Sequence, residues 1–282
     1  MMMERKTVMT RDGVELSYLT GGQGRPVLLL GGWSQTATVW AGQFADFCQS
    51  HTVYALDNRG HGESQKPSDG YRIQRFAKDL FDVAEALDLR DFDAVGHSLS
   101  VAMLWAYQDM FGTDRPARRM VFIDEPAALM ARPSWTEQEI EEAGSIHPTL
   151  EALDEMVRSI RQTRSIEDHL AIIGGMFSSR VSDATLRELA AENLKLPRNH
   201  AADLIENLMV QDWRALLPYI PQPTLVFTGE LSWHPLASQQ FIAETMPNAS
   251  LEVFSEAEGG SHFLMFENPA LFNKKALSFL NG

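Results

Sequence analysis

The most informative chemical feature of this 282-residue sequence is a serine between small residues, in the segment GHSLS at 96–100. The apolar run 92–95 precedes this segment, and a helix-like pattern follows it. A sharp turn between a strand and a helix accepts only small flanking side chains and leaves its central residue exposed, here Ser98. The N-terminus of the following helix favours negative charge at that point. We therefore predict that Ser98 is a nucleophile, the alternative being a polar helix cap.

A serine hydroxyl becomes a nucleophile beside a base, and the base needs an acid to orient it. His262 lies in the glycine-rich segment GGSHF after the last predicted strand, and glycines allow a close approach. Asp124 ends the apolar run 120–123, which places it at the carboxyl edge of a sheet. Glu230, after the next core strand, is the reserve acid, and the side chain of Glu125 is expected to point elsewhere. The chain order predicts a triad of Ser98, His262 and Asp124.

Negative charge that develops on a substrate oxygen requires two backbone N–H donors. Leu99, directly after the nucleophile, is the first predicted donor of this oxyanion hole. The second is Trp33, which ends the segment LLLGGW after the first parallel strand. Its indole would also form an aromatic wall beside the reacting carbon.

Alternating strands and helices must position these residues. Short β-rich runs at 27–30, 52–56, 92–95, 120–123, 224–227 and 250–254 predict strands, and the segments 40–50, 75–88, 100–110, 235–245 and 269–280 predict helices. Strands that are apolar throughout indicate a parallel sheet covered on both faces. The segments 7–10 and 14–19, separated by Arg-Asp-Gly, predict an antiparallel hairpin at the sheet edge.

The segment from about 134 to 217 is helical in character and exceeds any connecting loop. Helix starts are expected at Ser134 with Glu137 as a capping box, at Ser165 with Asp168, and at Ser182. We predict an α/β core formed by 1–127 and 218–282, with 128–217 inserted as a helical lid. Candidate residues for the apolar lining of a substrate pocket, in a pattern equally typical of ordinary core, are Trp33, His97, Trp135, Met176, Phe177, Leu204, Leu208, Met209 and Trp233.

The motifs GW at 32–33, DNRGHG at 57–62, GHSLS at 96–100, Asp124 and SHF at 261–263 together resemble those of the α/β-hydrolases. The context HSLSVAMLWAY, with FGTDR and FIDEPAAL, is similar to the non-haem haloperoxidase and esterase branch. The resemblance implies a mostly parallel central sheet with helices on both faces and an inserted helical lid. Ser232 stands where this family commonly has its acid, which favours Asp124. In DNRGHG, Arg59 and His61 are expected to anchor loops.

The resemblance leaves three functions open. The leading hypothesis is a serine hydrolase of a small apolar ester, lactone or activated ketone that acts through an acyl-enzyme. The second is a cofactor-independent dioxygenase that cleaves a 3-hydroxy-4-quinolone-type heteroaromatic with a His262–Asp124 base, although Leu99 stands where the best known of these enzymes have His. The third is a non-hydrolytic isomerase or a small-molecule receptor. Ser98 argues against a dehalogenase, which would have Asp at that position.

The composition limits the partners. The chain has 24 Lys and Arg against 38 Asp and Glu, a formal net charge of −14, which disfavours nucleic acid, an anionic membrane surface or a polyanion and is interpreted as an aid to solubility. The single Cys48 forms no internal disulfide, and the start MMMERKTVMTRDG lacks the apolar run of a signal peptide. We expect a cytoplasmic monomer or homodimer that binds a small apolar organic substrate.

No metal or cofactor is predicted. The sequence has no glycine-rich phosphate loop of the Walker or dinucleotide type. His97, beside the predicted nucleophile, is interpreted as a packed histidine. The other histidines without an assigned role have no metal-ligand spacing and are His147, His169, His200 and His234.

Overall fold

The computed structural model describes residues 3–146 and 149–282, and its centre is an eight-stranded sheet in the order β1-β2-β4-β3-β5-β6-β7-β8. The first two strands and the β2–β4 pair are antiparallel, and the pairs from β4 to β8 are parallel. The strands are β1 (Glu4–Met9), β2 (Glu15–Gly21), β3 (Arg25–Leu30), β4 (His51–Leu56), β5 (Asp93–His97), β6 (Met120–Ile123), β7 (Thr224–Gly229) and β8 (Ala249–Phe254). The predicted hairpin at the sheet edge and the mostly parallel sheet are thus confirmed.

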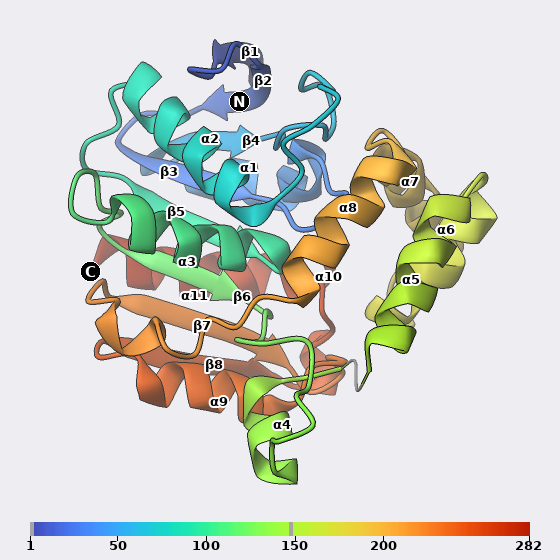
Figure 1. The fold of residues 1–282 in the computed structure, drawn as a ribbon. Helices are drawn as coiled ribbons and strands as arrows, with labels where there is room; N and C mark the ends of the chain where they lie inside the picture. Colours follow the sequence, from blue (N-terminus) through green and yellow to red (C-terminus); the bar gives the residue numbers. More distant parts are fainter. Residues whose placement is uncertain (1–2, 147–148) are drawn as a thin grey trace.

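Helices cover both faces of the sheet, which explains why every residue of the central strands β5, β6 and β7 is buried. On one face α1 (Ala41–Phe47) packs beside α11 (Pro269–Asn281), and on the other α2 (Ile73–Ala86) packs beside α3 (Leu99–Phe111). The helix α9 (Leu236–Thr245) lies on the same face as α3, against β7 and β8. Figure 1 shows α3 and α11 on opposite sides of the sheet. The short helix α10 (Leu264–Glu267), which follows His262, was not predicted.

The helix α2 illustrates why these segments are helical. Its buried residues Ile73, Phe76, Ala77 and Leu80 recur at intervals of three and four, so one stripe of the helix faces the sheet. By contrast, all side chains of β6 are buried, because helices cover both of its faces. The change between these two patterns along the chain produces the alternating α/β order.

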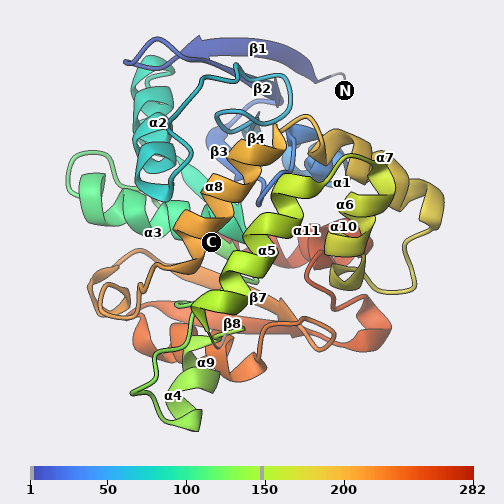
Figure 2. The ribbon, with the colours of Figure 1, turned by 45° about the vertical axis from the view of Figure 1, so that its right-hand side comes forward.

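The helices between β6 and β7 form two groups. The helix α4 (Glu137–Ala143) packs against α9, beside the core, although it falls within the predicted lid. The others lie beyond the carboxyl ends of the parallel strands, where α5 packs on α8 and α6 on α7 (Figure 1, Figure 2). We call this second group the helical cover, and it comprises α5 (Leu150–Gln162), α6 (Ile166–Ile173), α7 (Asp183–Asn193) and α8 (Arg198–Met209).

The predicted start of α4 is wrong by two residues. The helix is capped by Thr136, whose Oγ1 accepts from the N–H of Glu139, while the Glu139 carboxylate accepts from the N–H of Thr136. The N–H of Trp135 donates to the carbonyl of Arg132, so the chain is still in a turn at Ser134. The starts at Ser165 and Ser182 are as predicted, and each hydroxyl accepts from the N–H three residues on. Among the described residues, no helix is long and apolar enough to cross a bilayer.

Candidate active site

Ser98 occupies the turn between β5 and α3 with a left-handed backbone, φ 50°. The turn is held by hydrogen bonds from the N–H of Ser98 to the carbonyl of Ile123 and from the N–H of Val101 to the carbonyl of Ser98. A Cβ on Gly96 would lie 2.9 Å from Leu104 Cδ1, so the turn leaves no space for a larger residue there. A non-glycine residue in this conformation is strained, and such strain is characteristic of functional sites.

Asp124 and His262 form a short hydrogen bond: Asp124 Oδ2 lies 2.6 Å from His262 Nδ1, and both side chains are buried. Thr228 and Ser232 donate their hydroxyl protons to the two carboxylate oxygens of Asp124, each at 2.6 Å. Burial by itself would raise the pKa of Asp124, but the hydrogen bond and charge of His262, together with Ser232, hold that pKa below its ordinary value. Asp124 is therefore an ionised acceptor for the imidazole.

Ser232 stands at the position where the family that the motifs resemble commonly has its acid. The residue that stands in place of the common acid donates a hydrogen bond to the alternative acid, Asp124. The reserve acid Glu230 is exposed, and its carboxylate accepts from the N–H of Glu256 rather than from an imidazole. The structure thus brings Asp124, and not Glu230, to His262.

The two predicted oxyanion donors lie on either side of Ser98. Leu99 is the first residue of α3, where backbone N–H groups lack an intrahelical acceptor. The loop before Trp33 passes close to the serine, since a Cβ on Gly32 would lie 3.0 Å from Ser98 Cβ. The Trp33 indole extends outward, and its Nε1–H donates to the carbonyl of Ala201 in α8 at 2.8 Å.

A cavity with about 530 Å³ of atom-free space, part of it at the mouth, connects these residues with the helical cover. Of the predicted lining residues, five are present: Trp33, Met176, Leu208, Met209 and Trp233. The complete lining from the core is Trp33, Gln35, Ser98, Glu125, Trp233, His234, His262 and Phe263, and that from 128–217 is Leu129, Ile146, Met156, Ile173, Met176, Asn193, Ile205, Leu208 and Met209. Most of the lining is apolar, and its polar side chains are those of Gln35, Ser98, Glu125, His234 and His262 from the core and Asn193 from α7.

Four predicted lining residues lie elsewhere. Phe177 stacks on Phe263 at a centroid distance of 4.0 Å, and Leu204 is fully buried in the core on α8. Trp135 lines a separate surface pocket, where the guanidinium of Arg214 lies 3.9 Å from the centre of its ring. His97 is buried behind the site, where its Nε2–H donates to the carbonyl of His262 at 2.9 Å. Spacing alone did not separate lining residues from core, because both recur at helical intervals.

The expectation for Glu125 is wrong, because its side chain faces the cavity next to Ser98. Glu125 Oε2 accepts from the Ser98 hydroxyl at 3.4 Å, and Oε1 has no hydrogen-bond partner in the described structure. Successive residues of a strand point to opposite faces, but Asp124 has a φ of 54°, which ends that alternation. Burial, and then the charge of Asp124, raise the pKa of Glu125 well above its ordinary value, which favours the protonated form of the carboxyl group.

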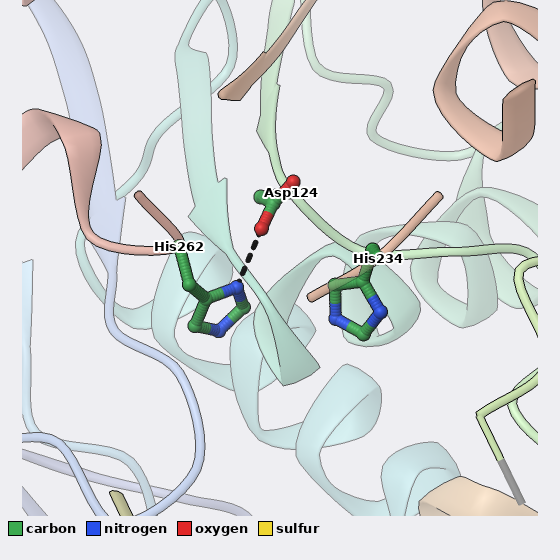
Figure 3. Close-up of side chains that lie close together, drawn as sticks. All are labelled: Asp124, His234 and His262. Carbon is green, nitrogen blue, oxygen red and sulfur yellow. Dashed lines mark hydrogen bonds and ion pairs between the residues drawn. The ribbon is translucent and has the colours of Figure 1, made fainter. Parts of the chain in front are cut away.

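His234 is a second residue that the sequence did not assign. It is buried beside His262, with ring centroids 5.4 Å apart, and lines the cavity (Figure 3). Burial lowers its pKa to about 3, so the ring is neutral. The sequence did not predict that His234 lies close to Asp124 and His262, because residues 231–234 form an irregular connection rather than an element with a periodic pattern.

In the part of the chain that the structure describes, two groups of side chains have ligand atoms close enough for a metal ion. Asp124, His234 and His262 bring theirs within 4.8 Å of one another, but the hydrogen bond between Asp124 and His262 already occupies two of these atoms. In the second group, of Asp12, Asp79 and Asp82, the charges are compensated by Arg59 and Arg75. His147 lies outside the described residues.

The segment DNRGHG anchors loops, as expected from its sequence. Arg59 donates to Asp79 and Asp12. His61 accepts from the N–H of Ser34 through Nε2, next to the loop that carries Trp33. Burial lowers the pKa of His61 to about 4, so it stays neutral.

Comparison with known proteins agrees with this architecture. A family model described as "Alpha/beta hydrolase family" matches residues 27–275. The non-heme chloroperoxidase CPO-A1 of Kitasatospora aureofaciens is 29% identical over 282 residues, which cover 96% of this chain and 98% of that protein. The sequence relatives therefore include the haloperoxidase branch that the motifs resemble.

Solved structures resemble the whole chain. A bromoperoxidase from Bacillus anthracis has a TM-score of 0.87 and 23% identity, with 98% of this chain and 100% of that chain covered. An esterase from Exiguobacterium antarcticum also has a TM-score of 0.87, with 18% identity and coverage of 98% and 99%. At these identities the likeness shows the fold.

Proposed function

Because this chain belongs to the alpha/beta hydrolase family, we propose that it is a serine hydrolase of a small apolar ester, lactone or activated ketone. The observation that carries the proposal is the 2.6 Å hydrogen bond between His262 and Asp124, next to a cavity that Ser98 also lines. The cavity walls favour an apolar substrate, and a carbonyl beside Ser98 would lie between the proposed oxyanion donors.

In the proposed mechanism, Ser98 Oγ attacks the carbonyl carbon while its proton passes to His262 Nε2. Asp124 holds the Nδ1–H tautomer and stabilises the imidazolium that forms. The backbone N–H groups of Leu99 and Trp33 donate to the oxyanion, and His262 then protonates the leaving group. Water, deprotonated by His262, hydrolyses the acyl-enzyme.

The resting serine must turn for this reaction. Its hydroxyl donates to Glu125, and no hydrogen bond to His262 is present among the described residues. A rotation about the serine side-chain bond redirects the hydroxyl, and hydrogen bonds of this kind commonly tighten when a substrate binds.

The decisive test is Ser98→Ala against a panel of short-chain 4-nitrophenyl esters and lactones. We expect turnover to fall by about 10³-fold or more, with the thermal midpoint close to that of the parent. A fluorophosphonate should label the parent stoichiometrically and leave Ser98→Ala unlabelled. Ser100→Ala is the matched control in the same turn, and it should retain the label. Turnover by Ser98→Ala within tenfold of the parent would exclude the serine mechanism.

One observation favours a second candidate, a cofactor-independent dioxygenase of a 3-hydroxy-4-quinolone-type heteroaromatic. The Asp124–His262 pair is complete without the serine, as a base acting directly on a substrate requires. In that reaction His262 removes the hydroxyl proton and molecular oxygen attacks the resulting carbanion. Oxygen uptake that survives Ser98→Ala and disappears in His262→Ala would select this function over hydrolysis.

A further inference from the structure

We propose that Glu125 forms a polar subsite in the cavity. The carboxyl group of Glu125 donates a hydrogen bond to a carbonyl oxygen of a ligand that is otherwise apolar. The inference rests on the proposed function only for the position of the scissile group beside Ser98. The subsite itself is a binding property, and its test does not require turnover.

The position of the carboxyl group carries the argument. Glu125 is only 3% exposed, yet it lines the cavity next to Ser98. Its two oxygens differ: Oε2 accepts from the Ser98 hydroxyl, whereas Oε1 is fully buried without a hydrogen-bond partner. Buried polar atoms are nearly always paired, so an unpaired carboxyl oxygen at a cavity wall indicates a partner that a ligand supplies.

The surroundings determine the charge of the group. No Lys or Arg is among the described residues that line the cavity, and the adjacent Asp124 carboxylate is ionised. The titratable rings that line the cavity are His262, bonded to Asp124, and the neutral His234. Two carboxylates side by side in a buried site repel each other, which favours the protonated form of Glu125.

The position of the proton follows from the hydrogen bonds. Oε2 is the acceptor of the Ser98 hydroxyl, so the carboxyl proton belongs on the unpaired Oε1, which the proposal makes the donor to the ligand. A neutral O–H donor selects an acceptor such as a carbonyl oxygen. A carboxylate ligand would bring its charge beside Asp124, and an entirely apolar ligand would leave the donor unpaired.

The rest of the wall determines the body of the ligand. Opposite the polar groups, the helical cover contributes aliphatic and thioether side chains, which include Met156, Ile173, Ile205 and Met209. A ligand that satisfies both regions has a compact apolar body and one carbonyl group besides the one that reacts. This describes a keto ester, a keto lactone or a cyclic ketone conjugate.

The test compares two probes of nearly equal shape, acetophenone and ethylbenzene, by calorimetric titration. The measured quantity is the ratio of their dissociation constants, since the ratio removes the general effect of the cavity size. We expect this ratio to shift about tenfold in favour of ethylbenzene in Glu125→Leu, which has no donor. Glu125→Gln, whose amide N–H₂ restores a donor, should keep the ratio within about threefold of the parent value, and Met176→Leu, on the apolar wall, is the matched control.

A ratio in Glu125→Leu that stays within about threefold of the parent value would overturn the proposal. If Glu125→Leu does not fold, infrared difference spectroscopy of the parent and Glu125→Gln decides. The parent should show a protonated-carboxyl band that shifts to lower frequency when acetophenone binds and is missing in Glu125→Gln. A band that does not shift would also overturn the subsite. Neither measurement involves catalysis, so failure of the serine mechanism would leave both results interpretable.

Discussion

The two walls of the cavity are constructed in different ways. On the sheet side, backbone conformation fixes the polar groups: Ser98 and Asp124 both have positive φ, and Asp124 accepts three short hydrogen bonds. On the side of the helical cover, the wall consists of side chains from helices whose outer faces are exposed to solvent. In the proposed mechanism, the atoms that must be held within a fraction of an ångström lie at strand ends, whereas helices enclose the rest of the ligand.

Several polar contacts among the described residues join the sheet side to the helical cover. The indole of Trp33 donates to the carbonyl of Ala201, and Arg198 lies over the Trp33 ring at 5.6 Å. Thr36 donates to Glu192 of α7. We infer that changes to the sheet-side wall alter the chemical step, whereas changes to the helical cover alter binding and stability.

Asp124→Asn is expected to lower kcat by about 10⁴-fold, because the amide no longer holds the required tautomer of His262. Glu230→Gln, on the next strand end, is the matched control and should change kcat by less than about twofold, since its carboxylate contacts only the N–H of Glu256. Steady-state kinetics on the most active ester gives both values. Equal losses in the two variants would mean that the acid is not determined by the end of β6.

Two changes on α8 separate the functions of the helical cover. Leu204 is fully buried and lies outside the cavity lining, so Leu204→Ala should lower the free energy of unfolding by about 2–5 kcal/mol and leave KM nearly unchanged. Met209 lines the cavity, so Met209→Ala should change KM several-fold with kcat within about threefold. Denaturant titration and steady-state kinetics measure the two effects. A large loss of kcat in Met209→Ala would show that this wall also positions the reacting atoms.

The difference between the walls also explains what the sequence could predict. The positions of the strands along the chain and of Asp124 depend on β-rich runs and their ends, which are local patterns. The orientation of Glu125 depends on the φ of its neighbour, and the cavity contribution of His234 depends on an irregular connection. Trp135 and Phe177 have the same residue types and spacing as true lining residues, and only the tertiary packing places them elsewhere. Local patterns therefore predicted the sheet-side wall better than the helical cover.

Acid should weaken the sheet side through His61, whose pKa burial lowers from 6.5 to about 4. Below pH 6.5 His61 binds a proton in the unfolded chain, whereas in the folded chain it stays neutral down to about pH 4. The free energy of unfolding therefore falls as the pH is lowered through this window. The difference corresponds to about 3 kcal/mol at most. In His61→Asn, the slope of unfolding free energy against pH should decrease by about one proton in this range.

Hydrogen exchange locates this effect. In the parent at low pH, exchange should increase first in the loop at 32–36, where His61 accepts from the N–H of Ser34. His169→Asn is the control on the helical cover, because burial lowers the pKa of His169 to about 4 as well. Its ring lies on α6 and packs on Trp33. An unchanged pH slope in His61→Asn would assign the acid sensitivity to other buried groups.

The smallest expected effect concerns α4, which lies between β6 and β7 in the chain but packs beside α9 in space. Thr136→Ala removes the hydroxyl that accepts from the N–H of Glu139 and should weaken α4 by about 1 kcal/mol, whereas Ser134→Ala should have almost no effect. We expect α4 to unfold independently of the helical cover. Hydrogen exchange in Thr136→Ala should then become faster only within residues 137–143, and the KM for the best ester should be unchanged. Faster exchange that extends into α5 and α8, together with an increase in KM, would instead show that α4 unfolds with the helical cover. The boundary between the two walls would then lie at the end of β6.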